Sequence, residues 1–314
     1  MAQYAMTDEQ ITNFDYAFNR YVEFASPITQ IIPWVDSPVA YGEEFYYPAK
    51  PAQPTVGKLF DYEKQAEIQY TALTDKSAAI WLDLEIPDVD RRILASTSMN
   101  VENAWGQLAA MQLMKQVAHT VYMGDTVTEF TGLFGSASYT STYATIGWNT
   151  ALGPHSTISD MLFNAAADLW ANGFVPPYVC VLSTNLKYGT TVTINAAPVA
   201  DITNGDMMLN ILNGNKSGDT SRLFFEHIGT NSPDLNVVYP FETATTNDGR
   251  ALVMKPVQNG VNYVEGRWMQ RPHSTDWTFD AKTDRWHTRI KCMIALRVLD
   301  TNAIAAHTTI DLVL

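Results

Sequence analysis

Residues 102–135 read ENAWGQLAAMQLMKQVAHTVYMGDTVTEFTGLFG, a long helical pattern that stops at Gly124-Asp125 and is soon followed by Gly132-Leu133-Phe134. Ser98 or Asn100 can cap this helix, and Gly124 suits its end because glycine adopts positive φ without strain. Such a helix could line a cofactor site, pair with a partner helix or act as a strut. Its apolar residues recur at helical spacing and predict one buried face: Val101, Trp105, Leu108, Met111, Met114, Ala118 and Val121.

Before this helix the sequence predicts a shorter helix, an extended arm, a hairpin and a strand. The capping-box spacing at 7–10 begins the shorter helix. Five prolines between residues 31 and 54 exclude a central strand or a long helix, so we expect an extended arm that lies on another surface, such as a neighbouring subunit. Residues 55–78 are polar and suit a projecting hairpin. Apolar and polar residues alternate over 80–86, which predicts a half-buried strand that Pro87 ends.

After the long helix, residues 136–156 are rich in Ser, Thr and Gly and predict a loop, with a boundary between lobes near residue 150. Helix and strand patterns then alternate and predict a small α/β lobe over 150–250. The predicted elements of this lobe are a helix from Ser156 or Thr157 to Gly173, a buried strand at 177–183, a short helix at 206–213 and a strand at 235–241. Further strands are expected at 251–257, 262–268 and 286–298, the last with its even-numbered residues on one face.

The composition favours an oligomer that does not bind nucleic acid in a sequence-specific way. The chain has 314 residues, of which 46% are hydrophobic and only 17% are charged, against about 25% charged in an average protein. Surfaces with so few charges are often covered by other protein. The net charge of −13 and the short basic groupings exclude a cluster of cations that could neutralise phosphates.

Few motifs indicate a catalytic, metal-binding or cofactor-binding site. The six histidines are scattered and the two cysteines, Cys180 and Cys292, lie in apolar strand-like runs, where a buried reduced thiol is the favoured interpretation. We expect no catalytic residue, no metal site and no cofactor. The N-terminus lacks the pattern of a signal peptide, and no run approaches the ~18 apolar residues of a membrane span, so we expect synthesis in a cytoplasm and no membrane contact.

One acidic cluster stands out at the end of the strand over 80–86. Paired carboxylates can act as acid and base or bind calcium, but here arginines follow directly and no Gly-rich binding loop is present. A charged, solvated strand end is the plainest interpretation. Our hypothesis is that the cluster makes ion pairs with another subunit; its members are Asp83, Glu85, Asp88, Asp90, Arg91 and Arg92.

The order of these parts resembles the major capsid proteins of tailed viruses with the Hong Kong 97-type fold, which encapsulin shell proteins share. In that family a long spine helix ends in Gly-Asp and is followed shortly by Gly-Leu-[Leu/Phe]; here Asn100–Met123, Gly124-Asp125 and Gly132-Leu133-Phe134 stand in those places. The resemblance implies an α+β capsid fold without a catalytic site. The long helix is then a strut.

The resemblance also implies a division of the chain and a function. The division is an N-terminal arm at 1–41, an extended loop at 42–86, a peripheral domain at 87–149 with the spine helix, an axial domain at 150–250, and closing strands of the peripheral domain at 251–314. The implied function is self-assembly of pentamers and hexamers into an icosahedral shell around double-stranded DNA, in a virion assembled in host cytoplasm. Because the arm carries no core of its own, deleting it should leave folded subunits that cannot close a shell.

Other functions are open at this point. An encapsulin-like cellular compartment would have the same fold around a protein cargo. A tail or decoration protein would form rings or tubes, and an α+β hydrolase would use the acidic cluster. Since the arm begins almost at Met1, either scaffolding is a separate protein or the shell needs none, as in encapsulins. A separate scaffolding, portal or cement protein could thus be a partner, and packaged DNA would be held without sequence-specific contacts.

Overall fold

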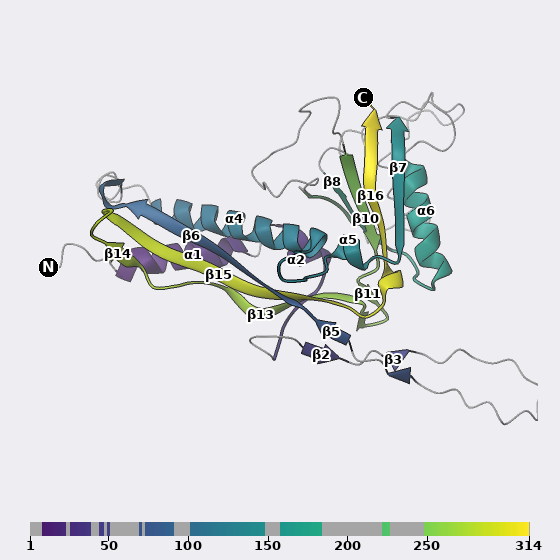
Figure 1. Ribbon diagram of the computed structural model, residues 1–314, viewed down its shortest axis with the longest axis horizontal. Coiled ribbons are helices and arrows are strands. Elements are labelled where there is room, and N and C mark those ends of the chain that lie inside the picture. Colours follow the sequence, from purple (N-terminus) through teal and green to yellow (C-terminus); the bar gives the residue numbers. More distant parts are fainter. Residues whose placement is uncertain are drawn as a thin grey trace, which may run out of the picture.

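The computed structural model describes residues 8–22, 26–38, 44–46, 49–50, 69–70, 73–90, 101–147, 158–183, 222–226 and 248–313. The described residues form a mixed α+β structure with two five-stranded sheets. Figure 1 shows the first sheet and two long helices lying along the long axis of the molecule, with the second sheet standing across one end. The α+β class expected from the sequence is confirmed.

The first sheet is built around strand β15 (Arg285–Val298), where every even-numbered residue from Trp286 to Leu296 is buried. This burial confirms the alternation expected from the sequence. The antiparallel strand β6 lies along one edge of β15, β13 and β14 lie along the other, and β1 joins β13 in parallel. The bounds of these neighbours are β1 Trp34–Asp36, β6 Ser77–Pro87, β13 Val264–Ser274 and β14 Thr278–Asp280.

Helices α4 (Val101–Met123) and α1 (Asp8–Val22) pack together on the first sheet. The helices approach closely at Gly106, where a Cβ atom would lie 2.7 Å from the Phe14 carbonyl oxygen and 3.0 Å from the Phe18 nitrogen. A glycine inside a helix normally costs about 1 kcal/mol relative to alanine. Here it provides the space that the backbone of α1 occupies, so Gly106 is required by packing.

The prediction of which face of α4 is buried is partly wrong. Leu108 and Met111 are 56% and 48% exposed. Because α4 contacts α1 as well as β6 and β15, its buried surface is wide and is rotated away from the single stripe that the sequence suggested. The buried residues are Ala109, Ala110, Leu113, Met114, Val117, Ala118, Val121 and Tyr122.

The arm expected at 1–41 also needs correction. Within it, α1, the short helix α2 (Ile28–Ile31) and β1 all pack on the same chain. Phe14 and Phe18 are fully buried in the main hydrophobic cluster. The prolines do keep β1 at the edge of its sheet, as expected. The apolar side chains of α1 and α2, however, give the arm a core in its own chain, so it does not need a neighbour to bury them.

The second sheet has the strand order β7-β16-β10-β8-β9, with parallel pairs at both ends and antiparallel pairs between them. Helix α6 (Ile158–Ala171) packs on it, and β8 and residues 250–254 of β10 are almost entirely buried. One hydrophobic cluster runs through both sheets. The strand bounds are β7 Tyr139–Gly147, β8 Val179–Ser183, β9 Arg222–Glu226, β10 Asp248–Met254 and β16 Ile304–Val313.

One sequence expectation fails at this sheet. The loop expected at 136–156 contains strand β7, because its Ser and Thr residues are interspersed with tyrosine and isoleucine, and threonine and aromatic residues favour strands. The division into domains at 150 and 250 stays a prediction, and its bounds differ from those of the sheets. Strands β7, β10 and β16 join β8 and β9, so only part of the region 251–314 closes the sheet under the spine helix. The elements expected at 206–213 and 235–241 lie outside the described residues.

The remaining elements are short. Two antiparallel pairs form a ribbon that leads into β6, and Figure 1 shows it below the first sheet. No helix of the described residues is long and apolar enough to span a membrane. The short elements are β2 Glu44–Tyr46 with β5 Leu73–Asp75, β3 Ala49–Lys50 with β4 Gln69–Tyr70, α5 Leu133–Ser136, the hairpin β11 Val257–Gln258 and β12 Val261–Asn262, and the 3₁₀ turn η4 Thr301–Ala303.

Candidate functional site

The acidic cluster at the end of β6 forms a ladder of ion pairs with β15. Asp83 lies opposite Arg289 in the register, and its carboxylate accepts hydrogen bonds from Arg289 Nε at 2.5 Å and Nη2 at 2.9 Å. These hydrogen bonds lower the pKa of Asp83, although desolvation opposes the change. A carboxyl with a lowered pKa stays ionised at neutral pH, so Asp83 is unsuited to act as a general acid.

Glu85 continues the ladder one step further along β6. Its carboxylate accepts a hydrogen bond from Arg285 Nη1 at 2.8 Å, and His287 Nδ1 lies 3.6 Å away. The side chains of Glu85 and Arg285 are about half exposed. Ion pairs in such a position are solvated and contribute little to stability.

Asp88 differs from its neighbours because it is buried. Its carboxylate accepts a hydrogen bond from the indole Nε1 of Trp286 at 3.0 Å, and its backbone N–H donates to the Asp284 carbonyl at 3.0 Å. Asp88 therefore fastens the end of β6 to the start of β15. The sequence grouped it with the solvated acids because burial of a carboxylate has no signature in a sequence pattern.

The hypothesis of ion pairs to another subunit is thus not needed for Asp83, Glu85 and Asp88, which have partners in their own chain. Asp90 is exposed beyond the strand, while Arg91 and Arg92 lie outside the described residues. Beside the ladder is an open groove of about 570 Å³ between β6, β14 and β15. Among the residues that the structure describes, no group of three His, Cys, Asp or Glu side chains could hold a metal ion.

The Gly-Asp sequence at the end of the spine helix forms a tight turn. Gly124 has φ +81°, and its N–H donates to the Thr120 carbonyl at 2.8 Å. Asp125 pairs with Phe130 through two backbone hydrogen bonds of 2.8 and 2.9 Å. The Asp125 carboxylate accepts from the Thr128 hydroxyl at 2.6 Å, which lowers the pKa of Asp125. This aspartate therefore holds a turn and is not free for chemistry.

The Gly-Leu-Phe sequence anchors that turn against the helix end. A Cβ atom at Gly132 would collide with the Gly124 nitrogen and the Tyr122 carbonyl oxygen, and one at Gly124 would lie 2.5 Å from the Phe130 carbonyl oxygen. Leu133 and Phe134, which follow directly, are buried. Because neither glycine has a side chain, the backbone around Gly132 can pack directly against the backbone at the end of the helix. The motif therefore has a structural role.

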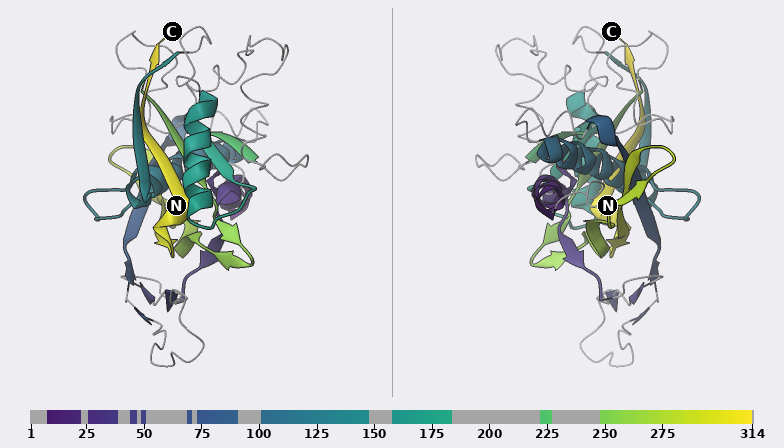
Figure 2. Two further views of the ribbon diagram at one scale, coloured as in Figure 1. Left: turned by 90° about the vertical axis from the view of Figure 1, so that its right-hand side faces the viewer. Right: turned by 90° about the vertical axis from the view of Figure 1, so that its left-hand side faces the viewer.

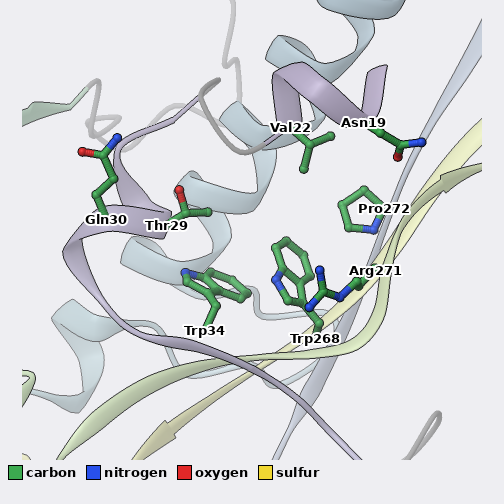
Figure 3. A pocket seen from close by; sticks show the side chains of 8 residues that line it. All are labelled: Asn19, Val22, Thr29, Gln30, Trp34, Trp268, Arg271 and Pro272. Atoms are coloured by element: carbon green, nitrogen blue, oxygen red, sulfur yellow. The ribbon is translucent and has the colours of Figure 1, made fainter. Parts of the chain in front are cut away.

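A second groove, of about 480 Å³, lies where the N-terminal segment meets β13. Figure 3 shows the indole rings of Trp34 and Trp268 side by side in it, and their centroids are 4.2 Å apart. The Trp34 ring lies over Gly266, where a Cβ atom would be 2.6 Å from the ring. Beside them, Arg271 Nε and Nη2 donate to the Asp36 carboxylate at 2.7 and 2.9 Å. These contacts fix β1 to its own chain, and they could not be predicted from the sequence because each partner is far away along the chain.

The two cysteines are free and buried, as expected. Burial raises the pKa of both thiols, that of Cys292 to about 12. A thiol with so high a pKa carries almost no thiolate at neutral pH, so neither cysteine is an activated nucleophile.

No protein-family model matches this chain, and no curated protein sequence matches it at a significant level. Solved structures do match it. A virus-like particle from Pyrococcus furiosus has a TM-score of 0.60 at 10% identity, covering 95% of this chain and 99% of that one. The capsid of Myoviridae phage XM1 has a TM-score of 0.57 at 12% identity, covering 90% and 91%. The capsid of an empty GTA particle has a TM-score of 0.59 at 11% identity, covering 91% and 90%.

These similarities extend over nearly the whole length of both chains in each pair. Identities of 10–12% carry no information on residue roles but define the fold. The chain has the Hong Kong 97-type fold, with the long spine helix α4 lying on a sheet and a second sheet at one end. The fold expected from the sequence is confirmed.

Proposed function

We propose that this chain is a structural subunit that assembles with copies of itself into a closed icosahedral shell, as a major capsid protein of a tailed virus. The observation that carries the proposal is the near-complete match to capsid structures in both directions. The two capsid structures cover 90% and 91% of this chain, so few of its residues are left over for a separate enzymatic domain. In the shell, subunits would group into pentamers and hexamers.

Three features of the chain support this proposal. The ribbon β2–β5 and β3–β4 is only two strands wide, and an isolated two-stranded ribbon has marginal stability in water. A neighbouring subunit would supply the missing packing surface. The low content of charged residues suits extensive protein contacts, and the net charge of −13 suits a container whose DNA must not adhere to its wall.

The division into domains is part of the proposal and follows the sheets. The peripheral domain would comprise α1, α4 and the first sheet, and the axial domain α6 and the second sheet, with the ribbon as the extended loop. On this division, strands β10 and β16 belong to the axial domain. The expected arm at 1–41 then contributes α1 to the peripheral domain.

A structural role also agrees with the acidic cluster. A hydrolase would need a carboxylate that is free to exchange a proton with a substrate. Asp83 and Glu85 are held by arginines, and Asp88 is buried against Trp286. These three acids join β6 to β15 within the first sheet.

The cargo distinguishes a viral capsid from an encapsulin-like compartment. The TM-scores of 0.60 for the Pyrococcus virus-like particle and of 0.57 and 0.59 for the two capsids do not favour the compartment over the capsid. We propose DNA as the cargo, with a separate portal and scaffolding or cement protein, and assembly in host cytoplasm.

Sedimentation of purified particles with absorbance at 260 and 280 nm tests this proposal. Particles from infected or induced host cells should sediment as shells, and nuclease-resistant DNA should raise the 260 nm absorbance of the filled fraction. Shells that contain only protein from every source would favour the compartment. A small, discrete oligomer in place of shells would refute both forms of the proposal.

A further inference from the structure

The sequence contains four Asn-Gly pairs, and the structure describes two of them, Asn172-Gly173 and Asn259-Gly260. An asparagine before a glycine can lose its side-chain amide without an enzyme. The next backbone nitrogen can reach the side-chain carbonyl carbon, and glycine has no side chain to hinder the approach. Both asparagines are exposed to water. The two pairs therefore have the same local chemistry, and only their structural surroundings differ.

The pair Asn172-Gly173 is held by the end of helix α6. Figure 2, left, shows α6 upright at the surface, and Asn172 directly follows its last residue. Gly173 has φ +88°, and its N–H donates to the Trp170 carbonyl at 2.9 Å. The next N–H, that of Phe174, donates to the Leu169 carbonyl at 2.9 Å. These two hydrogen bonds form a Schellman motif, a common end of a helix at glycine.

The atoms that would react in this pair are also engaged. The attacking nitrogen has to lose its proton, which the Trp170 carbonyl holds. The Asn172 Nδ2 donates to the Asp168 carbonyl oxygen at 2.9 Å. Phe174 is only 3% exposed and belongs to the main hydrophobic cluster. Attack at Asn172 therefore requires the last turn of the helix to open and a buried aromatic side chain to move.

The pair Asn259-Gly260 forms the tip of the β11–β12 hairpin. Gln258 and Val261 face each other in the register, so these two residues alone make the turn, with φ +54° at Asn259 and +79° at Gly260. A turn with positive φ at both central residues is closed by a hydrogen bond between its first and fourth residues. The Gly260 N–H takes no part in that closure.

This turn can open without disturbing the core. Strands β11 and β12 have two residues each, and so short a two-stranded ribbon opens at low cost. Residues 259–261 are all exposed. Apart from its chain neighbours, no atom of the described residues lies within 4 Å of where a Cβ of Gly260 would be. Rotation about the Cα–C bond of Asn259 therefore brings the Gly260 nitrogen to the side chain and moves no buried residue.

We propose that Asn259 is a site of spontaneous deamidation, a modification that does not depend on the proposed shell function. The Gly260 nitrogen attacks Cγ of Asn259, the new N–C bond closes a succinimide ring, and Nδ2 leaves as ammonia with the proton of the Gly260 amide. One water molecule then opens the ring at either carbonyl and gives aspartate or isoaspartate. Each event replaces a neutral amide by a carboxylate, and no atom is oxidised or reduced.

The isoaspartate form also alters the shape of the hairpin. Its main chain runs through the side-chain carbons, so the turn becomes longer by one backbone atom and loses its geometry. Gln258, directly before the turn, accepts a hydrogen bond from the Val175 N–H at 2.9 Å and donates one to the Gly173 carbonyl at 3.1 Å. These bonds fasten the hairpin to the segment after α6. Deamidation of Asn259 thus changes charge and shape beside this contact.

Peptide mapping by mass spectrometry tests the proposal on the purified protein, sampled during prolonged incubation at mildly alkaline pH. Fragment spectra assign the mass increase of deamidation to a residue. The variant N259D supplies the standard for the aspartate form, and an isoaspartyl methyltransferase applied to the isolated peptide detects isoaspartate. In the folded protein we expect Asn259 to react roughly ten times faster than Asn172, or more.

The control is the same incubation in concentrated urea, which removes the structure around both pairs. There we expect the two rates to agree within about twofold, because the local sequence is the same. Equal rates at Asn172 and Asn259 in the folded protein would overturn the proposal, as would an Asn259 that reacts in urea but stays unchanged in the folded protein. Neither result bears on the proposed shell function, because assembly does not enter the measurement.

Discussion

At the scale of single residues, the glycines of this chain have different physical roles. Gly106 makes room for a neighbouring backbone, Gly124 supplies a positive φ, and Gly132 lets the chain pass the helix end. The sequence identified Gly124 because glycine directly after a helix is a common stop signal. Gly106 was not recognised, because the helix that needs its missing side chain, α1, lies almost a hundred residues earlier.

Replacing Gly106 by Ala should therefore destabilise the subunit. In an ordinary helix this change adds about 1 kcal/mol of stability. Here the new Cβ would meet the Phe14 carbonyl, which cannot move without displacing α1, so we expect a net loss of about 1–3 kcal/mol. Denaturant unfolding of unassembled subunits measures this loss of unfolding free energy. Gly135→Ala is the control, since its Cβ would meet only the Thr131 methyl group at 3.2 Å. A gain in stability for G106A would show that the two helices are not in close contact.

The two kinds of acid at the end of β6 should respond differently to neutralisation. Asp88→Ala leaves the buried indole N–H of Trp286 without this acceptor, and we expect a loss of about 1–3 kcal/mol in unfolding free energy. Asp83→Asn should change it little, because the pair with Arg289 is exposed to solvent. Chemical unfolding of both variants at low and high salt tests this contrast. Equal losses would indicate that burial of Asp88 is not what distinguishes it.

At the scale of elements, the predictions that succeeded rest on local patterns. Strand β15 was predicted because its apolar residues alternate over its whole length, and α6 because its apolar residues recur at helical spacing up to Gly173. Strand β7 was missed because its polar residues resemble a loop, and its place beside β16 depends on residues more than 150 positions away. The buried face of α4 was misjudged because α1 covers a second side of it. The ladder residues were recognised, but their partners on β15 could not be inferred from spacing.

Helix α1 should behave as part of the core. Phe18→Ala should cost about 3–5 kcal/mol of unfolding free energy, because Phe18 is 1% exposed in the cluster beneath α4. Tyr16→Ala, on the exposed side of the same helix, should change stability by only about 0.5 kcal/mol.

Because α1 contributes buried residues to the core, deleting residues 1–41 should prevent folding, in contrast to the expectation from the sequence. A deletion variant that melts cooperatively at the wild-type temperature would restore the view of a separate arm.

The second sheet should lose stability in acid through His307. This residue is fully buried, and desolvation lowers its pKa to about 4 from the ordinary 6.5, although a backbone hydrogen bond at Met161 opposes the change. The unfolded chain binds a proton near pH 6.5 and the folded chain only near pH 4. Stability is therefore complete above pH 6.5 and falls as the pH decreases toward 4, by up to about 3 kcal/mol.

Thermal melting between pH 7.5 and 4.5 tests this prediction. His307→Phe removes the titrating group and should flatten the pH dependence of the melting temperature. An identical pH dependence in wild type and H307F would show that other groups cause the acid sensitivity.

At the scale of the whole molecule, the proposed function rests on the fold and on the surfaces that the described residues leave exposed. The chain matches two capsid structures and a virus-like particle over 90% or more of its length. Exposed aromatic residues on α6 and the low charge are unusual for a protein that acts alone. The sequence predicted this class from the order of its parts, while the contacts between copies could not follow from a single chain.

Electron microscopy of the purified full-length protein tests the central claim most directly. Negatively stained particles at moderate salt should be closed shells of uniform diameter, with five-fold and six-fold groups of subunits visible after three-dimensional averaging. Fields of small discrete oligomers, open tubes or flat rings, from a protein whose subunits fold normally, would contradict the claim that this chain builds an icosahedral shell.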